Sequence, residues 1–188
     1  MKDLSNKVSL RKDRKNLYIE LAVSSSTGAR IALLALSILI LLFLFYFMFF
    51  IADHNEMSAD SFVPFLGILG LDIWFIRSYL WNKFGKEYLI ISKKTFGYYY
   101  DYGILQTRRE TFKCSELSVN YVKLSENHPD GKLVFLNYNE ETNIQEEIHP
   151  TSIVITNEEC EYLIREIYSF LDINIEEDKD SVGFHYNK

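Results

Sequence analysis

The chain has 188 residues, a net charge of −6 and 48% hydrophobic residues. This acidic balance argues against a general nucleic-acid binder, which needs a basic surface to neutralise phosphates. The two cysteines, Cys114 and Cys160, have neither a metal-site spacing nor the pattern of a disulfide framework, and free thiols suit a reducing cytosolic side.

Residues 1–30 are predicted to form a basic cytoplasmic segment, with seven Lys and Arg residues against three acidic ones. This is the flank that the positive-inside rule requires before a first span. A cleaved signal peptide would have an apolar region of only about 7–15 residues and a small-residue cleavage site, and the sequence has neither. Within this segment, residues 16–23 are predicted to be a short strand or an interfacial helix.

Two apolar runs predict a transmembrane hairpin over residues 31–82. The first run, residues 31–52, has no charge, proline or glycine and is long enough to cross a hydrocarbon core of about 30 Å. The second run covers residues 62–81. The loop between them contains acids but no Lys or Arg, and basic residues flank both outer ends, so we expect both termini in the cytoplasm.

The second span contains an acidic and a basic side chain, Asp72 and Arg77, and two glycines, Gly67 and Gly70. Ionised groups in a bilayer are costly and are rarely incidental. Three interpretations stay open: a direct functional role for Asp72, helix assembly aided by the glycines, or tolerated polarity with Arg77 reaching the headgroups and Asp72 facing the first helix. We expect a homo-oligomer or a membrane-protein partner.

Residues 83–175 are predicted to form a cytoplasmic β-domain, an α+β fold in which an antiparallel sandwich or barrel is capped by one C-terminal helix. The strand patterns cover residues 87–92, 95–103, 104–112, 117–124, 132–138 and 143–149, with a turn at 127–131.

One helix follows the predicted strands. The run from Thr156 to Glu159 is a capping box, and apolar residues then recur at helical spacing: Cys160, Leu163, Ile164, Ile167 and Leu171. We expect this stripe to pack on the sheet. Residues 176–188 are acidic and are predicted to be a disordered tail.

Residues 62–175 resemble the bacterial pleckstrin-homology-like (PH-like) domains that follow two membrane helices. The resemblance rests on a first strand ending at Ser92, a second ending at Gly103, the Arg108-Arg109 pair in a third, and a fourth after residues 114–116. It implies a PH-like fold. In such folds the first turn often meets lipid headgroups, which implies anionic lipid contact for Lys93, Lys94, Arg108 and Arg109.

The chain is also similar in length and order to the photosystem I assembly protein family of cyanobacteria and plastids. The matching elements are Gly-Ala-Arg at residues 28–30, Tyr-Leu-Trp at residues 79–81 and Ile-Glu at residues 175–176. The family's Pro-Gln-Gly and Gly-Phe-Pro-Gly elements are missing. This resemblance implies a photosystem assembly factor.

Charge is unevenly distributed over the β-domain. Residues 83–113 hold seven Lys and Arg against three acids, whereas residues 114–188 hold five against sixteen. A negative inner leaflet attracts bases by about 1 kcal/mol each near its surface. Generic positive-inside charge is the alternative explanation.

Tyrosines cluster in the second predicted strand. Tyr98, Tyr100 and Tyr102 share one face of a strand, and Tyr99 takes the other. One face is expected to be core, and the other is either an aromatic surface for headgroups or a protein partner, or ordinary sheet packing.

The sequence shows no convergent catalytic motif, so we expect no enzyme, no cofactor and no metal site. The four histidines are scattered, and paired acids are typical of solvated faces. The preferred hypothesis is an integral membrane scaffold or assembly protein whose β-domain binds protein or anionic lipid. The alternative from another class is a two-span signalling effector with a ligand-sensing β-domain.

Overall fold

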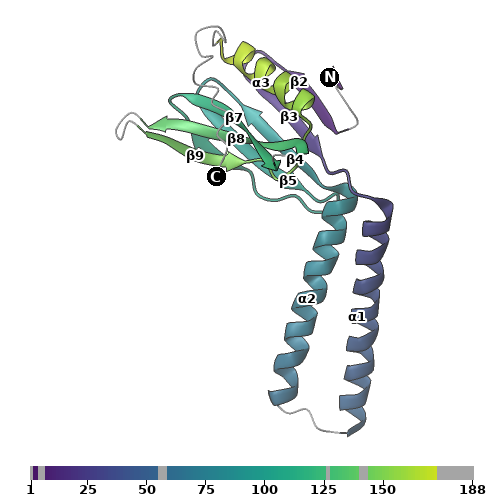
Figure 1. Ribbon diagram of the computed structural model, residues 1–188. Coiled ribbons are helices and arrows are strands. Elements are labelled where there is room, and N and C mark those ends of the chain that lie inside the picture. The colour runs from purple at the N-terminus through teal and green to yellow at the C-terminus, as the bar shows by residue number, and fades with distance from the viewer. Residues whose placement is uncertain (1, 4–6, 55–58, 126–127, 140–143, 173–188) are drawn as a thin grey trace. The chain divides into compact units, whose positions relative to one another are not determined.

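The computed structural model describes residues 2–3, 7–54, 59–125, 128–139 and 144–172 (Figure 1). The chain divides into two compact units. The helical unit comprises Val23–Gly85 with Tyr102–Ile104, and the β-domain comprises Met1–Ala22, Lys86–Asp101 and Leu105–Lys188. The predicted tail, residues 176–188, lies outside the described residues.

The helical unit is a pair of long apolar helices. Helix α1 covers Thr27–His54 and helix α2 covers Ala59–Phe84, and the two pair as a hairpin (Figure 1). Each contains a stretch long and apolar enough to cross a membrane, and most of these side chains are exposed. The predicted hairpin is confirmed, and both helices extend a few residues beyond the predicted spans.

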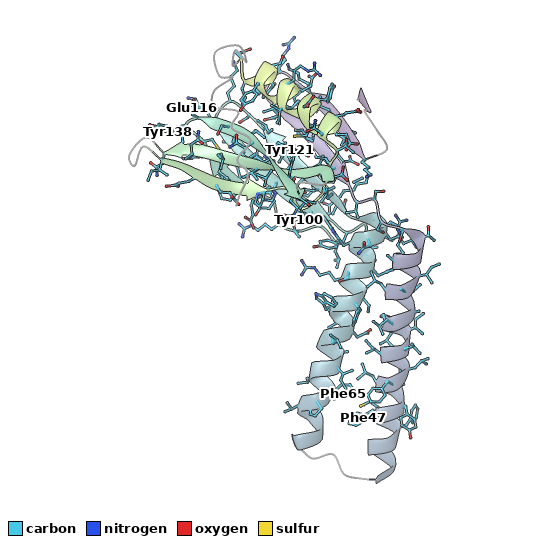
Figure 2. The ribbon with its side chains drawn as sticks, in the orientation of Figure 1. Phe47, Phe65, Tyr100, Glu116, Tyr121 and Tyr138 are labelled. Atoms are coloured by element: carbon cyan, nitrogen blue, oxygen red, sulfur yellow. The ribbon has the colours of Figure 1, made fainter. Side chains whose placement is uncertain are left out.

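A narrow seam joins the two helices. Ser37 and Leu44, which are seven residues apart on α1, are buried against α2. Near the loop end, Phe47 of α1 and Phe65 of α2 lie between the helices (Figure 2). Most of the other described apolar side chains of the two helices are exposed or half-buried, which suits an apolar surrounding.

Two antiparallel sheets form the β-domain. The larger sheet has the order β1 to β6, and five of its six strands have four or more residues. Its strands are β1 (Lys2–Asp3), β2 (Val8–Lys12), β3 (Leu17–Ala22), β4 (Lys86–Ile91), β5 (Thr95–Asp101) and β6 (Glu110–Lys113). The smaller sheet contains β7 (Leu117–Ser125), β8 (His128–Asn139) and β9 (Ile144–Pro150).

The N-terminal segment belongs to the larger sheet, which corrects the predicted division at residue 30. Strand β3 pairs with β4 along its whole length, from Leu17 opposite Ile91 to Ala22 opposite Lys86. Residues 17–22 are therefore a strand, as one of the two predictions for residues 16–23 had it. The helical hairpin is an insertion between two paired strands. The pairing could not be predicted from the order of the elements, because α1 and α2 separate β3 from β4 in the sequence.

Two predicted boundaries in the β-domain were wrong. Residues 104–109 do not continue a strand, because Gly103 turns the chain with φ of 88° and β6 begins only at Glu110. Residues 128–131, which were predicted to be part of a turn, belong to strand β8, which begins at His128. Gly131 lies within that strand, where an added Cβ would come within 2.7 Å of the Tyr121 ring.

The core of the β-domain lies between the two sheets. Phe96 of β5 stacks on Phe135 of β8 with ring centroids 4.5 Å apart. Fully buried aliphatic side chains surround this pair, among them Leu17, Ile19, Leu21, Leu89, Ile91, Leu133, Ile155, Leu163 and Ile167. Their burial is the main source of the domain's stability.

Helix α3, Asn157–Leu171, packs on β7 and also contacts β8. The predicted capping box at Thr156 and Glu159 is present. Cys160, Leu163 and Ile167 are buried, as the stripe predicted. On the same helix, the Tyr168 hydroxyl accepts from the Val119 N–H and donates to the Val119 carbonyl, both at 3.4 Å.

Both cysteines should be unreactive in the folded chain at pH 8. Burial raises the pKa of the Cys160 thiol to about 12 and also raises the pKa of Cys114. A pKa near 12 leaves about one thiol in ten thousand ionised at pH 8. We expect a chromogenic disulfide reagent to modify neither thiol in the detergent-solubilised chain, and both after unfolding in guanidinium. Modification of Cys160 at the unfolded rate would contradict its placement on α3.

Candidate functional site

A carboxylate is buried between the two sheets of the β-domain. Glu87 is the second residue of β4 and has no exposed side-chain surface. Because side chains alternate along a strand, it shares the inward face of β4 with Leu89 and Ile91, which are fully buried. A charged group on this face is costly unless donors surround it.

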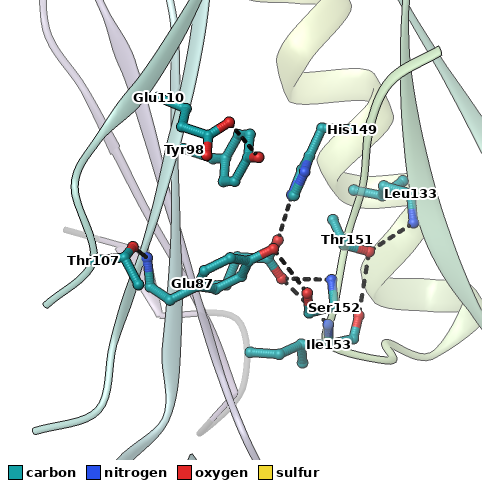
Figure 3. Close-up of polar contacts among 10 residues, drawn as sticks. Glu87, Tyr98, Thr107, Glu110, Leu133, His149, Thr151, Ser152 and Ile153 are labelled. Atoms are coloured by element: carbon teal, nitrogen blue, oxygen red, sulfur yellow. Dashed lines mark hydrogen bonds and ion pairs between the residues drawn. The ribbon is translucent and has the colours of Figure 1, made fainter.

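Three donors from the β9–α3 region meet this carboxylate (Figure 3). Its Oε1 lies 2.7 Å from His149 Nε2. Its Oε2 accepts hydrogen bonds from the backbone N–H groups of Ser152 at 2.8 Å and of Ile153 at 3.2 Å. We call this arrangement the Glu87 clamp, because one side chain of β4 holds a segment more than 60 residues away in the sequence.

Thr151 fixes the segment that supplies those donors. Its hydroxyl accepts from the Leu133 N–H at 3.0 Å and donates to the Ile153 carbonyl at 3.3 Å. Its own N–H donates to the Leu133 carbonyl at 2.8 Å. The chain therefore leaves β9 in a conformation that directs two successive N–H groups toward Glu87.

Aromatic side chains of β5 cover the clamp. The Tyr98 ring stacks on His149 with centroids 3.7 Å apart and an interplanar angle of 17°. Its hydroxyl donates to Glu110 Oε2 at 2.7 Å, and burial together with that carboxylate raises the pKa of Tyr98 to about 12. The hydroxyls of Tyr100 and Ser152 are hydrogen-bonded at 2.9 Å.

The geometry favours a fixed structural connection over acid–base chemistry at this place. Protein donors occupy both oxygens of Glu87, and Tyr98 covers one face of the imidazole. A general base would need an oxygen or nitrogen directed at a substrate. Among the described residues, no group of three or more His, Cys, Asp and Glu side chains could hold a metal ion.

The helical unit has a buried polar pair of its own. Asp72 is 1% exposed and accepts a hydrogen bond from the Ser37 hydroxyl at 2.7 Å. The predicted polar residue therefore faces the first helix, which was one of the three open interpretations. A polar contact between two helices in lipid is worth about 0.6–1.7 kcal/mol, so it stabilises their pairing modestly.

Arg77 lies near the C-terminal end of α2 and binds a tyrosine. Its Nη2 and Nε donate to the Tyr102 hydroxyl at 2.9 and 3.3 Å, and its guanidinium stands 5.2 Å from the ring centroid. The Trp81 ring also lies beside the Tyr102 ring, with centroids 5.2 Å apart. Tyr102 is thus a residue of the helical unit, separate from Tyr98 and Tyr100.

Gly67 and Gly70 are exposed on α2, and no atom lies within 4 Å of an ideal Cβ at either position. Helical spacing places both glycines on the side opposite Asp72. They therefore take no part in the packing of α1 on α2. Their predicted role in assembly concerns a different helix.

The four predicted lipid-binding bases form two separate pairs. Lys93 and Lys94 lie beside the C-terminal end of β6, and Arg108 and Arg109 directly precede its N-terminal end. Four strand residues, about 13 Å of backbone, separate the pairs. Lys93 Nζ also binds Asp172 at 2.6 Å and lowers the pKa of that carboxyl.

The predicted tyrosine face is divided in the structure. Tyr98 and Tyr100 point to the clamp and are half-buried. Tyr99 takes the other face, where it stacks on Tyr88 with centroids 4.7 Å apart. The aromatic pair on the outer side of the sheet is therefore Tyr88 and Tyr99.

The Glu87 clamp was not predicted from the sequence. Glu87 and His149 are the first residue of the predicted strand 87–92 and the last residue of the predicted strand 143–149, and nothing in the sequence connected them. One feature of the sequence could have indicated its burial. Side chains two residues apart on a strand share a face, so Glu87 lies on the same face as Leu89 and Ile91 and had to face the core. Its partners could not be predicted, because they depend on how the sheets pack.

The clamp predicts a local effect of Glu87→Gln. The amide keeps the shape but replaces one of the two acceptor oxygens by an NH₂ group, which donates and cannot accept, so the three donors no longer all have an acceptor. Hydrogen bonds to charged groups are worth about 1.5–3 kcal/mol, so the amides of Ser152 and Ile153 should exchange with deuterium about 10- to 100-fold faster. Hydrogen-exchange mass spectrometry of the full chain in detergent measures this change.

Glu147→Gln is the matched control, because this exposed residue of β9 carries the same substitution next to the same segment. In this variant we expect the free energy of opening at the Ser152 and Ile153 amides to change by no more than about 0.5 kcal/mol. Equal exchange in both variants would show that Glu87 does not hold the segment.

No protein-family model matches this chain, and no curated protein is found as a relative.

Proposed function

We propose that this chain is an integral membrane scaffold with a regulatory β-domain. In this proposal the hairpin spans the bilayer with both termini in the cytoplasm and gathers a membrane-protein partner or a second copy. The β-domain binds a cytosolic protein. The basic segments outside the two helices and the acidic loop between them support this orientation.

The observation that carries the proposal is the insertion of the hairpin between β3 and β4. An anchor requires only one attachment at a chain end. Here both helix ends continue into neighbouring strands, and the Val23 N–H donates to the Gly85 carbonyl at 2.9 Å. A change in the spacing of α1 and α2 would therefore act directly on a strand pair.

The Glu87 clamp extends this coupling within the β-domain. Glu87 is two residues beyond Gly85, the residue that ends the helical unit. Its carboxylate holds the segment from which α3 starts. A displacement of β4 thus reaches the β9–α3 connection through hydrogen bonds, which is the physical basis for the regulatory part of the proposal.

We further propose that the β-domain is PH-like. Two consecutive antiparallel sheets followed by one C-terminal helix support this assignment. In this chain the hairpin is inserted in the sequence between β3 and β4 of the larger sheet. This distinguishes it from a PH-like domain that follows its membrane helices.

Crosslinking in native membranes, read by mass spectrometry, tests the scaffold. We expect the wild-type chain to be captured with a membrane partner or a second copy. Gly70→Leu should lose that capture, because an added Cβ meets no atom of this chain within 4 Å, whereas a leucine side chain would block a closely packed helix of a partner. Gly28→Leu, at another glycine with open space, should keep it.

Two outcomes would contradict parts of this proposal. A wild-type chain captured with neither a partner nor a second copy would refute the scaffold. Unchanged crosslinks in Asp72→Leu would exclude Asp72 from assembly and limit it to its contact with Ser37.

A further inference from the structure

The turn after β5 exposes two large apolar side chains next to each other. Ile104 is 72% exposed and Leu105 is 66% exposed. The turn is closed at its base, where Asp101 pairs with Gln106 and the Thr107 N–H donates to the Tyr100 carbonyl at 2.8 Å. Its shape is therefore fixed, and the apolar pair stands at its tip.

This turn belongs to the helical unit as far as Ile104. Tyr102 packs on Arg77 and Trp81 of α2. Gly103 lies so close to Phe84 that an added Cβ would come within 2.7 Å of the Phe84 Cβ, and its φ is 88°. Glycine at this position brings the turn against the last two turns of α2.

The level of the contact on α2 gives the depth of the turn. Arg77 lies seven residues before Phe84, about 10 Å along the helix. Arginine and tryptophan near the end of a span mark the boundary between acyl chains and headgroups. Tyr102, which is bound to both, lies at the same level.

We propose that the turn Tyr102–Leu105 is a third membrane-contacting element, which inserts Ile104 and Leu105 into the headgroup–acyl boundary of the cytoplasmic leaflet. The occupant of this apolar surface is lipid, because Tyr102 at the start of the turn packs on Arg77 and Trp81 near the end of the apolar stretch of α2. Lys93 and Lys94 are excluded from this element, since they lie at the far end of β4.

The inference requires that α2 spans the membrane, but it does not require a protein partner. The full chain is reconstituted in lipid vesicles with both cysteines replaced by alanine and an environment-sensitive fluorophore on one introduced cysteine. We expect the label at Ile104→Cys to show blue-shifted emission and stronger quenching by lipids brominated at shallow than at deep acyl positions. Insertion of about 5–10 Å is typical of interfacial elements.

Two matched positions make the result decisive. Leu124 is an exposed apolar residue of β7, and a label at Leu124→Cys should emit as in water. Leu39 is an exposed residue of α1, and a label at Leu39→Cys should be quenched most strongly by lipids brominated at deep acyl positions. Water-like emission at position 104 with deep quenching at position 39 would overturn the inference. A label at position 39 that also emits as in water would instead overturn the spans and, with them, the proposed function.

Tyr102→Ala provides a second measurement. Loss of the ring removes the contacts with Arg77 and Trp81, so the label at position 104 should move toward water while the label at position 39 stays unchanged. Tyr102→Phe, which keeps the ring, should retain most of the insertion. Unchanged emission at position 104 in Tyr102→Ala would show that Tyr102 does not position the turn.

Discussion

The pairing of β3 with β4 is the constraint on which the rest of the structure depends. These strands are separated in sequence by the whole helical hairpin, yet they pair over six residues. Closing so long a connection costs conformational entropy, which the complete burial of Leu17, Ile19 and Leu21 in the core offsets. With this ladder in place, the ends of α1 and α2 are fixed beside each other, and the hairpin is part of the fold.

Each unit contains a buried acid, and the two acids are satisfied in different ways. Asp72 has one hydroxyl donor from the neighbouring helix, whereas Glu87 has two backbone amides and an imidazole. The second arrangement can hold a full negative charge, because three donors converge on it. Glu87 therefore favours one packing of the two sheets. Its loss would release the N–H groups of Ser152 and Ile153, which lie shortly before α3.

Several local features followed directly from the residue pattern. The two spans were predictable because a bilayer requires about 20 consecutive apolar residues, and α3 was predictable from its capping box and its 3.6-residue period. The strand predicted over residues 104–112 was wrong in its first six residues, since β-branched and apolar residues there are compatible with an exposed turn as well as with a sheet. The conformation of Gly103 and the contact with α2 decided between these possibilities.

The sequence by itself determined the pair of long apolar helices, the antiparallel β-domain and the C-terminal helix, because each depends on the hydrophobic pattern within a short segment. Tertiary structure alone decided that the N-terminal segment joins the larger sheet, that Asp72 faces Ser37, and that Glu87 meets His149. These are pairings between residues distant in the chain, and no local pattern encodes the partner. The same reason explains why the Tyr102–Leu105 turn was predicted as part of two strands. Its conformation depends on the contacts of Tyr102 and Gly103 with α2, which are distant in the sequence.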